Sequence, residues 1–140
     1  MKAVLRTLAA VLAGLLVLFI LVVAVELFSA VVHPLPKDFG GTKEEMCQHV
    51  ERYPQWVLAV VFPAWAVAAF ASTWTARRIG NLLSSAIIGL LLLAALVFNI
   101  SMLPYPTWFK IANLLVIPTA VFAGSRLSMR HKPTGTGDGN

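Results

Sequence analysis

The sequence predicts an all-α membrane protein: a four-transmembrane-helix bundle with a short amphipathic helix in the outer loop between helices 1 and 2. Of the 140 residues, 59% are hydrophobic and only 12% are charged, whereas soluble domains average about 45–50% apolar and about 25% charged residues. The apolar residues also gather into long runs, each close to the ~20 residues that cross a bilayer core. This composition excludes a soluble enzyme, a disordered chain and a nucleic-acid-binding module.

We expect the four spans at about residues 7–32, 55–76, 79–102 and 107–126. The first run is longer than the ~7–15 apolar residues of a secretory signal, which predicts an uncleaved helix. Pro104 and Pro106 end the third span, because proline removes a backbone donor and restricts the residue before it. The fourth span is short and starts near Thr107, with Lys110 reaching to the lipid headgroups.

The outer loop is expected to contain its own helix, over about residues 42–53. Thr42 and Glu45 have the spacing of a capping box, in which each side chain binds an otherwise unpaired backbone amide at the helix start. The apolar residues from Met46 to Tyr53 repeat with helical spacing and form one face. This face predicts a helix that lies against lipid or against the mouth of the bundle.

Positive charges predict the orientation in the membrane, since short cytoplasmic loops are rich in Lys and Arg. One side of the four spans carries Lys2, Arg6, Arg77, Arg78, Arg126, Arg130 and Lys132, and the other side carries Lys37, Lys43, Arg52 and Lys110. The richer side is predicted to be cytoplasmic, so both termini of a multi-pass protein of the bacterial inner membrane lie inside. Residues 1–128 form the transmembrane domain, and residues 129–140 are expected to be a disordered cytoplasmic tail.

A candidate polar pocket is expected near the outer side of the membrane. Glu26 is the one ionisable residue inside an apolar run of the first three spans, and intramembrane carboxylates are costly. His33 follows Glu26 on the same helix face, and the directions of the spans bring Asn99 and Asn113 to a similar depth. These four residues are therefore predicted to face one another beneath the outer loop helix.

The pocket can be interpreted in several ways. Glu26 and Asn99 could simply hydrogen-bond to each other, directly or through a water, and so join two helices. They could instead form a protonatable or ligand-binding site. A metal site built from Glu26, His33, His49 and Cys47 would have suitable ligand types but matches no known spacing. We predict no metal, no cofactor and no catalytic residues, since no known catalytic motif is present.

Aromatic residues near the ends of the spans are predicted to be interfacial anchors, because Trp and Tyr concentrate at membrane–water interfaces. These anchors are Tyr53, Trp56, Trp74, Tyr105 and Trp108. Trp65 lies between Trp56 and Trp74 on the opposite helix face, so we expect it to point into the bundle near mid-membrane.

Small residues recur at four-residue spacing on every span, which permits close approach of helices in lipid. The clearest sets are Ala10 and Gly14; Ala64, Ala68 and Ser72; Ser85 and Gly89; and Ala120 and Gly124. This spacing predicts either a compact bundle or contacts with a second copy or another membrane protein. The lipid bilayer is the expected surrounding, and no nucleic-acid partner is expected.

The order of several short motifs resembles a group of small uncharacterised bacterial four-helix integral membrane proteins. The resemblance rests on Glu26, His33-Pro34-x-Pro36, Trp65, Asn99, Pro104-x-Pro106-x-Trp108 and Pro118-Thr-Ala120-x-x-x-Gly124, and it extends to about Arg126. The group has no assigned activity, cofactor or partner. The resemblance implies four spans and implies no function.

The sequence is compatible with three functional hypotheses. The leading hypothesis is a non-enzymatic membrane component or assembly subunit that acts through helix contacts. The alternative is a small transporter or proton-coupled carrier that uses the polar pocket around Glu26. A weaker alternative is an integral-membrane enzyme. A sealed and fully paired Glu26 would favour the first hypothesis, whereas a pocket that opens outward would favour the second.

Overall fold

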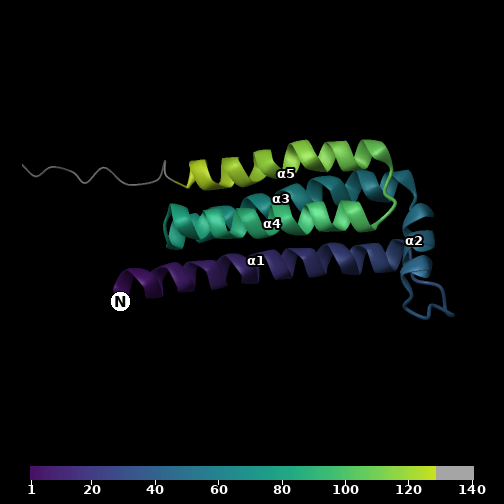
Figure 1. Cartoon of the computed structure of the whole chain (residues 1–140), viewed down its shortest axis with the longest axis horizontal. Coiled ribbons are helices and arrows are strands. Elements are labelled where there is room, and N and C mark those ends of the chain that lie inside the picture. The colour runs from purple at the N-terminus through teal and green to yellow at the C-terminus, as the bar shows by residue number, and fades with distance from the viewer. Residues whose placement is uncertain (129–140) are drawn as a thin grey trace, which may run out of the picture.

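The computed structural model describes residues 1–128, and the predicted disordered tail lies outside this range. The helices are α1 (Lys2–Val32), α2 (Lys43–Glu51), α3 (Gln55–Ile79), α4 (Leu82–Met102) and α5 (Thr107–Leu127). Figure 1 shows α1, α3, α4 and α5 side by side, with the short α2 across one end of the bundle. The first residue and the end of α5 lie at the opposite end. The predicted fold class is confirmed.

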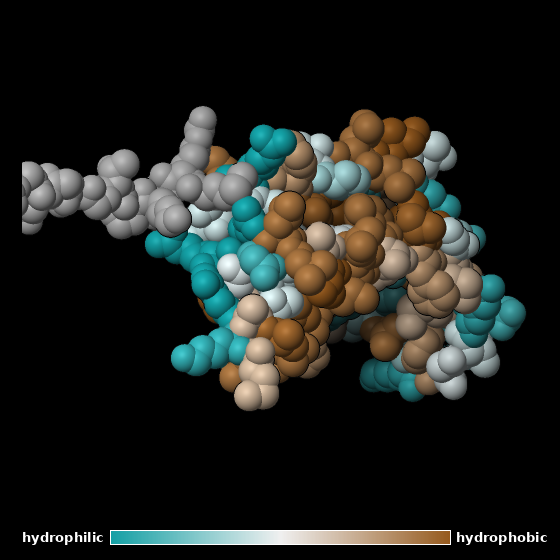
Figure 2. Space-filling view, turned by 60° about the vertical axis from the view of Figure 1, so that its left-hand side comes forward, coloured by the Kyte–Doolittle hydropathy of each residue, from teal (hydrophilic) through white to brown (hydrophobic). Residues whose placement is uncertain are grey.

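The four long helices are each long and apolar enough to cross a membrane. Large apolar side chains point outward on all of them, including Phe19, Val67, Phe98 and Phe122, which are 58–67% exposed. On the face seen in Figure 2, hydrophobic residues cover the middle and hydrophilic residues gather toward the two ends. Such a surface is stable in lipid and costly in water, so the chain is a multi-pass membrane protein.

Helix α3 is the centre of the bundle, because it packs against all three other long helices and makes the two most extensive helix contacts, with α1 and α5. Its buried side chains in the half that leads away from α2 are small: Ala68, Ala69, Ser72, Thr73 and Ala76. Small residues allow helix backbones to approach closely, which replaces the hydrophobic driving force that lipid does not provide. The small-residue spacing in the sequence thus serves packing inside this chain.

Helices α1, α3 and α4 meet closely at the end of the bundle away from α2. A Cβ atom built on Gly14 would lie 3.0 Å from the Ala76 Cβ and 3.1 Å from the Ile88 Cγ1. Closer to the N-terminus, the Arg6 Nε donates a hydrogen bond of 2.8 Å to the Ile79 carbonyl oxygen. These contacts hold the three helices together at this end, and at the other end Val25 of α1 packs against Val57, Leu58 and Val61 of α3.

The helix boundaries differ from the expected spans where charged residues continue a helix. Helix α1 starts at Lys2 and α3 extends to Ile79, because Arg77 and Arg78 lie in its last turn, where the helix dipole favours cations. Helix α4 starts later than expected, after an Asn81–Ser84 capping box. The predicted Thr42–Glu45 capping box of α2 is present.

Candidate functional site

Glu26 lies on α1 beside the face that packs against α3. Its neighbours Val25 and Ser29 are buried, whereas Glu26 itself is exposed at the surface of the protein. Within residues 1–128, the Glu26 carboxylate has no hydrogen-bond or ion-pair partner. Glu26 lies inside the apolar run of α1, about 30 Å along the helix from Arg6, so it is expected near the outer edge of the ~30 Å hydrocarbon core. A carboxylate at that depth is less well solvated than one in bulk water.

A lower cavity of about 190 Å³ lies beside Glu26 and extends toward the middle of the membrane. Helices α1 and α4 form its two sides, and α3 forms its floor. The walls are mainly apolar: Leu18, Val22, Ala68, Ala69, Leu92, Ala95, Leu96 and Ile117. Three of these residues are alanines, which leave the space that larger side chains would fill. Since Glu26 lines this cavity and is exposed, the cavity reaches the lipid-facing surface.

An upper cavity of about 180 Å³ lies between the lower one and α2. Met46, His49 and Val50 of α2 form its roof, and Tyr53 and Tyr105 contribute hydroxyl groups to its walls. The upper cavity is therefore more polar than the lower one. The two cavities share Glu26, Trp65 and Asn99, so the carboxylate lies where a polar space meets an apolar one.

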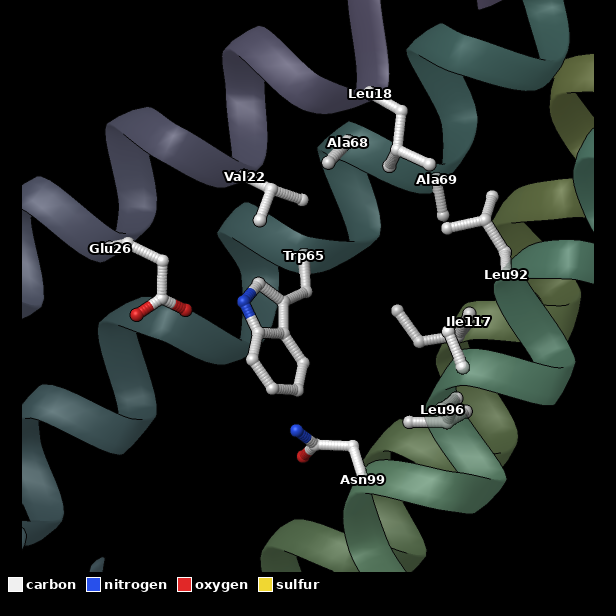
Figure 3. Close-up of a pocket in the computed structure, with 11 residues that line it drawn as sticks. Leu18, Val22, Glu26, Trp65, Ala68, Ala69, Leu92, Leu96, Asn99 and Ile117 are labelled. Carbon is white, nitrogen blue, oxygen red and sulfur yellow. The ribbon is translucent and has the colours of Figure 1, made fainter. Parts of the chain in front are cut away.

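Glu26, Trp65 and Asn99 come from three different helices and point into the same space, as Figure 3 shows. In that view the Trp65 indole lies between the carboxylate of Glu26 and the amide of Asn99. The Asn99 Oδ1 is buried and accepts no hydrogen bond. The Phe109 ring packs edge-on against Trp65, with the two ring centroids 5.8 Å apart. The site thus presents the Glu26 carboxylate and the Asn99 oxygen as hydrogen-bond acceptors, the Asn99 amide and the Trp65 indole N–H as donors, and one aromatic ring.

The predicted hydrogen bond between Glu26 and Asn99 is not formed directly, although both residues line the same two cavities. His33 and Asn113 are absent from the walls of both cavities. Asn113 is completely buried, and its Nδ2 donates a bond of 2.8 Å to the Phe109 carbonyl oxygen. It lies one turn beyond Phe109 on the face of α5 that packs against α3, which turns it away from the cavities.

His33 instead helps to attach α2 to α1. Its Nε2 donates to the His49 carbonyl oxygen over 3.1 Å, and the two imidazole rings stack with centroids 4.3 Å apart. Tyr53 packs against both rings, at 4.5 Å from His33 and 5.4 Å from His49. On the other side, the Cys47 thiol lies 3.9 Å from the Met102 carbonyl oxygen of α4. These contacts hold α2 over the upper cavity.

Burial shifts the pKa of three side chains around the upper cavity, His49, Tyr53 and Tyr105. It lowers the pKa of His49, and the neighbouring His33 lowers it further. Burial also raises the pKa of the Tyr53 and Tyr105 hydroxyls, so both remain neutral donors at physiological pH. A neutral His49 is therefore part of the attached position of α2.

Acidification is expected to loosen α2. Because the pKa of His49 is lower in the folded protein than its ordinary value near 6.5, the unfolded segment binds a proton more readily than the folded one. The free energy that holds α2 in place is therefore greatest above about pH 6.5 and decreases as the pH falls below that value. Amide hydrogen exchange over residues 43–51, corrected for the intrinsic rate at each pH, should be faster at pH 5 than at pH 7.5.

His49→Phe provides the matched control, because phenylalanine keeps a ring against His33 but does not titrate. The pH dependence of exchange in α2 should shrink in this variant. An unchanged pH dependence would show that another group governs the attachment of α2.

The predicted aromatic anchors fall into two groups. Trp56, Trp74 and Trp108 are 56%, 37% and 42% exposed, and the Trp108 Nε1 donates to the Gln55 Oε1 over 2.8 Å. Tyr53 and Tyr105 instead pack against the buried cluster that contains Phe109. Proline precedes or follows each tyrosine in the sequence, and the turn directs the ring inward rather than along the membrane surface.

Sequence reasoning missed His49, Tyr53, Tyr105 and Phe109 as parts of the cavity wall. The repeated Tyr-Pro-x-Trp pattern at the start of α3 and α5 was the available signal, but aromatic residues there are equally typical of anchors. The metal-site hypothesis finds no support in geometry: residues 1–128 contain no group of three or more His, Cys, Asp or Glu side chains that could hold an ion.

Comparison with protein-family models, with curated proteins and with solved structures finds no match to this chain. The resemblance expected from the short motifs is therefore confirmed only for the architecture, and no family is identified. What the structure itself establishes is a four-span helical membrane protein with a short helix across one end.

Proposed function

We propose that this protein is a non-enzymatic membrane protein that binds a small ligand in the cavities around Glu26, as a carrier does. The observation that carries this proposal is the Glu26 carboxylate, which lines two cavities at membrane depth and has no partner within residues 1–128. Unpaired polar groups in lipid are costly. An unpaired carboxylate at this depth costs stability, and this one lines a cavity that a ligand could fill, so the arrangement favours binding.

The assembly-subunit hypothesis receives less support. Its main argument was the set of small residues at four-residue spacing, which could have formed a surface for another helix. Ala10, Gly14, Ser72, Ser85 and Gly124 are instead buried inside the bundle. They are already used in packing α1, α3, α4 and α5 against each other.

Glu26→Leu tests the proposal through stability. Because Glu26 has no partner to lose, we expect this variant to be at least as stable as the wild type, and up to about 1–3 kcal/mol more stable. Thermal unfolding in nanodiscs measures the difference. The isosteric Glu26→Gln variant controls for side-chain shape, and Glu44→Leu controls for removal of an exposed carboxylate outside the membrane. A Glu26→Leu protein that is clearly less stable than the wild type would assign Glu26 a structural role.

The proposed location is the bacterial inner membrane, with both termini in the cytoplasm. The arrangement of helices supports it, because Arg6, Arg77 and Arg126 all belong to the end of the bundle opposite α2. Fusion of green fluorescent protein after residue 128 should fluoresce, whereas alkaline phosphatase at the same position should be inactive. Insertion of phosphatase near Gly40 should give activity. The reverse pattern would invert the orientation.

A further inference from the structure

We propose that the cavities bind a protonated primary alkylamine, with its ammonium group beside Glu26 and its alkyl chain in the lower cavity. This inference rests on the proposed function and adds the chemical class of the ligand. It follows from the charge of the cavity walls, from their hydrogen-bonding groups and from the order of polar and apolar surfaces along them.

The charge of the site favours a cation. Among residues 1–128, Glu26 is the only acidic residue that lines either cavity, and no Lys or Arg lines them. Trp65, Tyr53 and Tyr105 add aromatic faces, which attract cations through the ring quadrupole. A carboxylate or phosphate on the ligand would instead meet the Glu26 charge, and the one basic side chain in the upper cavity wall, His49, is kept neutral by its lowered pKa.

The hydrogen-bonding groups favour an amine that carries N–H donors. The Asn99 Oδ1 is buried and accepts no hydrogen bond, and the Glu26 carboxylate has only acceptors when ionised. A primary ammonium group has three donors and could satisfy both residues. A quaternary ammonium group could interact with Glu26 and Trp65 but would leave the Asn99 oxygen unpaired, which costs affinity.

An inorganic cation fits less well than an organic one. Calcium takes six to eight oxygen ligands and magnesium retains several waters in an octahedral shell. The junction of the two cavities provides one carboxylate and one amide oxygen on otherwise aromatic and apolar walls. The apolar lower cavity, by contrast, matches an alkyl chain that enters from the lipid between α1 and α4.

The order of the surfaces fixes the orientation of the ligand. The apolar lower cavity lies on the mid-membrane side of Glu26, and the polar upper cavity lies on the side of α2. An amphiphile in the outer half of the bilayer has its polar head toward the outer surface, as the upper cavity is, and its alkyl chain toward mid-membrane, as the lower cavity is. It could therefore enter the site from the side without reversing its orientation.

Decylammonium is the probe for this proposal, with decyltrimethylammonium and decyl sulfate as comparisons of equal chain length. The protein is placed in phosphatidylcholine nanodiscs with Trp56, Trp74 and Trp108 replaced by Phe, so that Trp65 alone reports on the cavity. A thermal unfolding curve that matches the wild type shows that this background is folded. Decylammonium should change the Trp65 emission saturably, decyltrimethylammonium should bind at least fivefold more weakly, and decyl sulfate should give no saturable change.

Two variants separate specific binding from partition into lipid. Glu26→Gln should weaken decylammonium binding at least tenfold while retaining the shape of the side chain. Asn99→Leu should remove most of the difference between decylammonium and decyltrimethylammonium, because it removes the acceptor that needs an N–H donor. Equal binding of both amines to the wild-type protein would overturn the role of Asn99 and hence the primary-amine class.

Three outcomes would overturn the ligand class. They are saturable binding of decyl sulfate, decylammonium binding that Glu26→Gln leaves unchanged, and no saturable response to any of the three probes. If phosphatidylethanolamine in the nanodisc competes with decylammonium for the site, the natural ligand would be a lipid with an ammonium headgroup. That result would overturn the proposal of a single-chain alkylamine. The Glu26→Leu stability test is independent of all these results, so the proposed binding function can survive the loss of this ligand class.

Discussion

Gly124→Ala is expected to lower the free energy of unfolding of the bundle by about 1–3 kcal/mol, the usual cost of overpacking. Gly124 is buried in α5 against α3, and an added Cβ atom would lie 2.6 Å from the Phe70 carbonyl oxygen and 3.1 Å from the Trp74 amide nitrogen. It would come still closer to the Thr73 Oγ1. Two of these three atoms belong to the α3 backbone, so the methyl group can be accommodated only if α5 and α3 move apart.

Gly89→Ala is the matched control for this substitution. A Cβ atom on Gly89 would meet only the Val121 Cγ1, at 2.7 Å, which is one side-chain atom rather than the backbone of a neighbouring helix. Alanine also gains about 0.5–1 kcal/mol over glycine inside a helix, which offsets part of the cost of shifting Val121, so Gly89→Ala should cost less than Gly124→Ala. Reversible unfolding in mixed micelles compares the two variants. Equal stability of both would show that the α3–α5 contact is looser than the structure indicates.

The fold could be predicted from the sequence because lipid imposes few solutions. Apolar runs near 20 residues can only be helices when they cross a membrane, since each backbone amide must be paired within its own segment. Local chemistry also fixed the start of α2 through Thr42 and Glu45. The start of α4 after its N-cap Asn81 was harder to predict, because the apolar run begins before it and the cap depends on two short polar side chains.

The candidate site was predictable only in part. Glu26 and Asn99 were recognisable because a polar residue in an apolar run is rare, and both line the two cavities. Asn113 shares that property but faces α3, since its orientation depends on the rotation of α5 about its axis. The sequence specifies the periodicity of a helix and not that rotation, which packing around α3 determines. The stacking of His33 on His49 depends likewise on the path of the loop between α1 and α2.

Phe109 provides the second large effect, because it is both a core residue and a wall of the upper cavity. Its side chain is completely buried, and its ring packs against Trp65, Tyr105 and Trp108 at centroid distances of 5.8, 4.9 and 5.6 Å. In lipid such contacts stabilise a helix bundle through close packing rather than through removal of apolar surface from water. The loss of the ring would therefore leave a space that its neighbours cannot easily fill.

Phe109→Ala is expected to lower the free energy of unfolding by about 3–5 kcal/mol, as large-to-small substitutions do in tightly packed interiors. Phe98→Ala in α4 is the matched control, because Phe98 is 67% exposed toward lipid and lipid chains can replace its contacts; a change within about 0.5 kcal/mol is expected. Unfolding of both variants in the same micelles measures the difference. If the two substitutions cost the same, Phe109 would not be packed as the structure shows. A large difference would place the rigid part of the bundle directly behind Trp65, where a binding site needs a fixed wall.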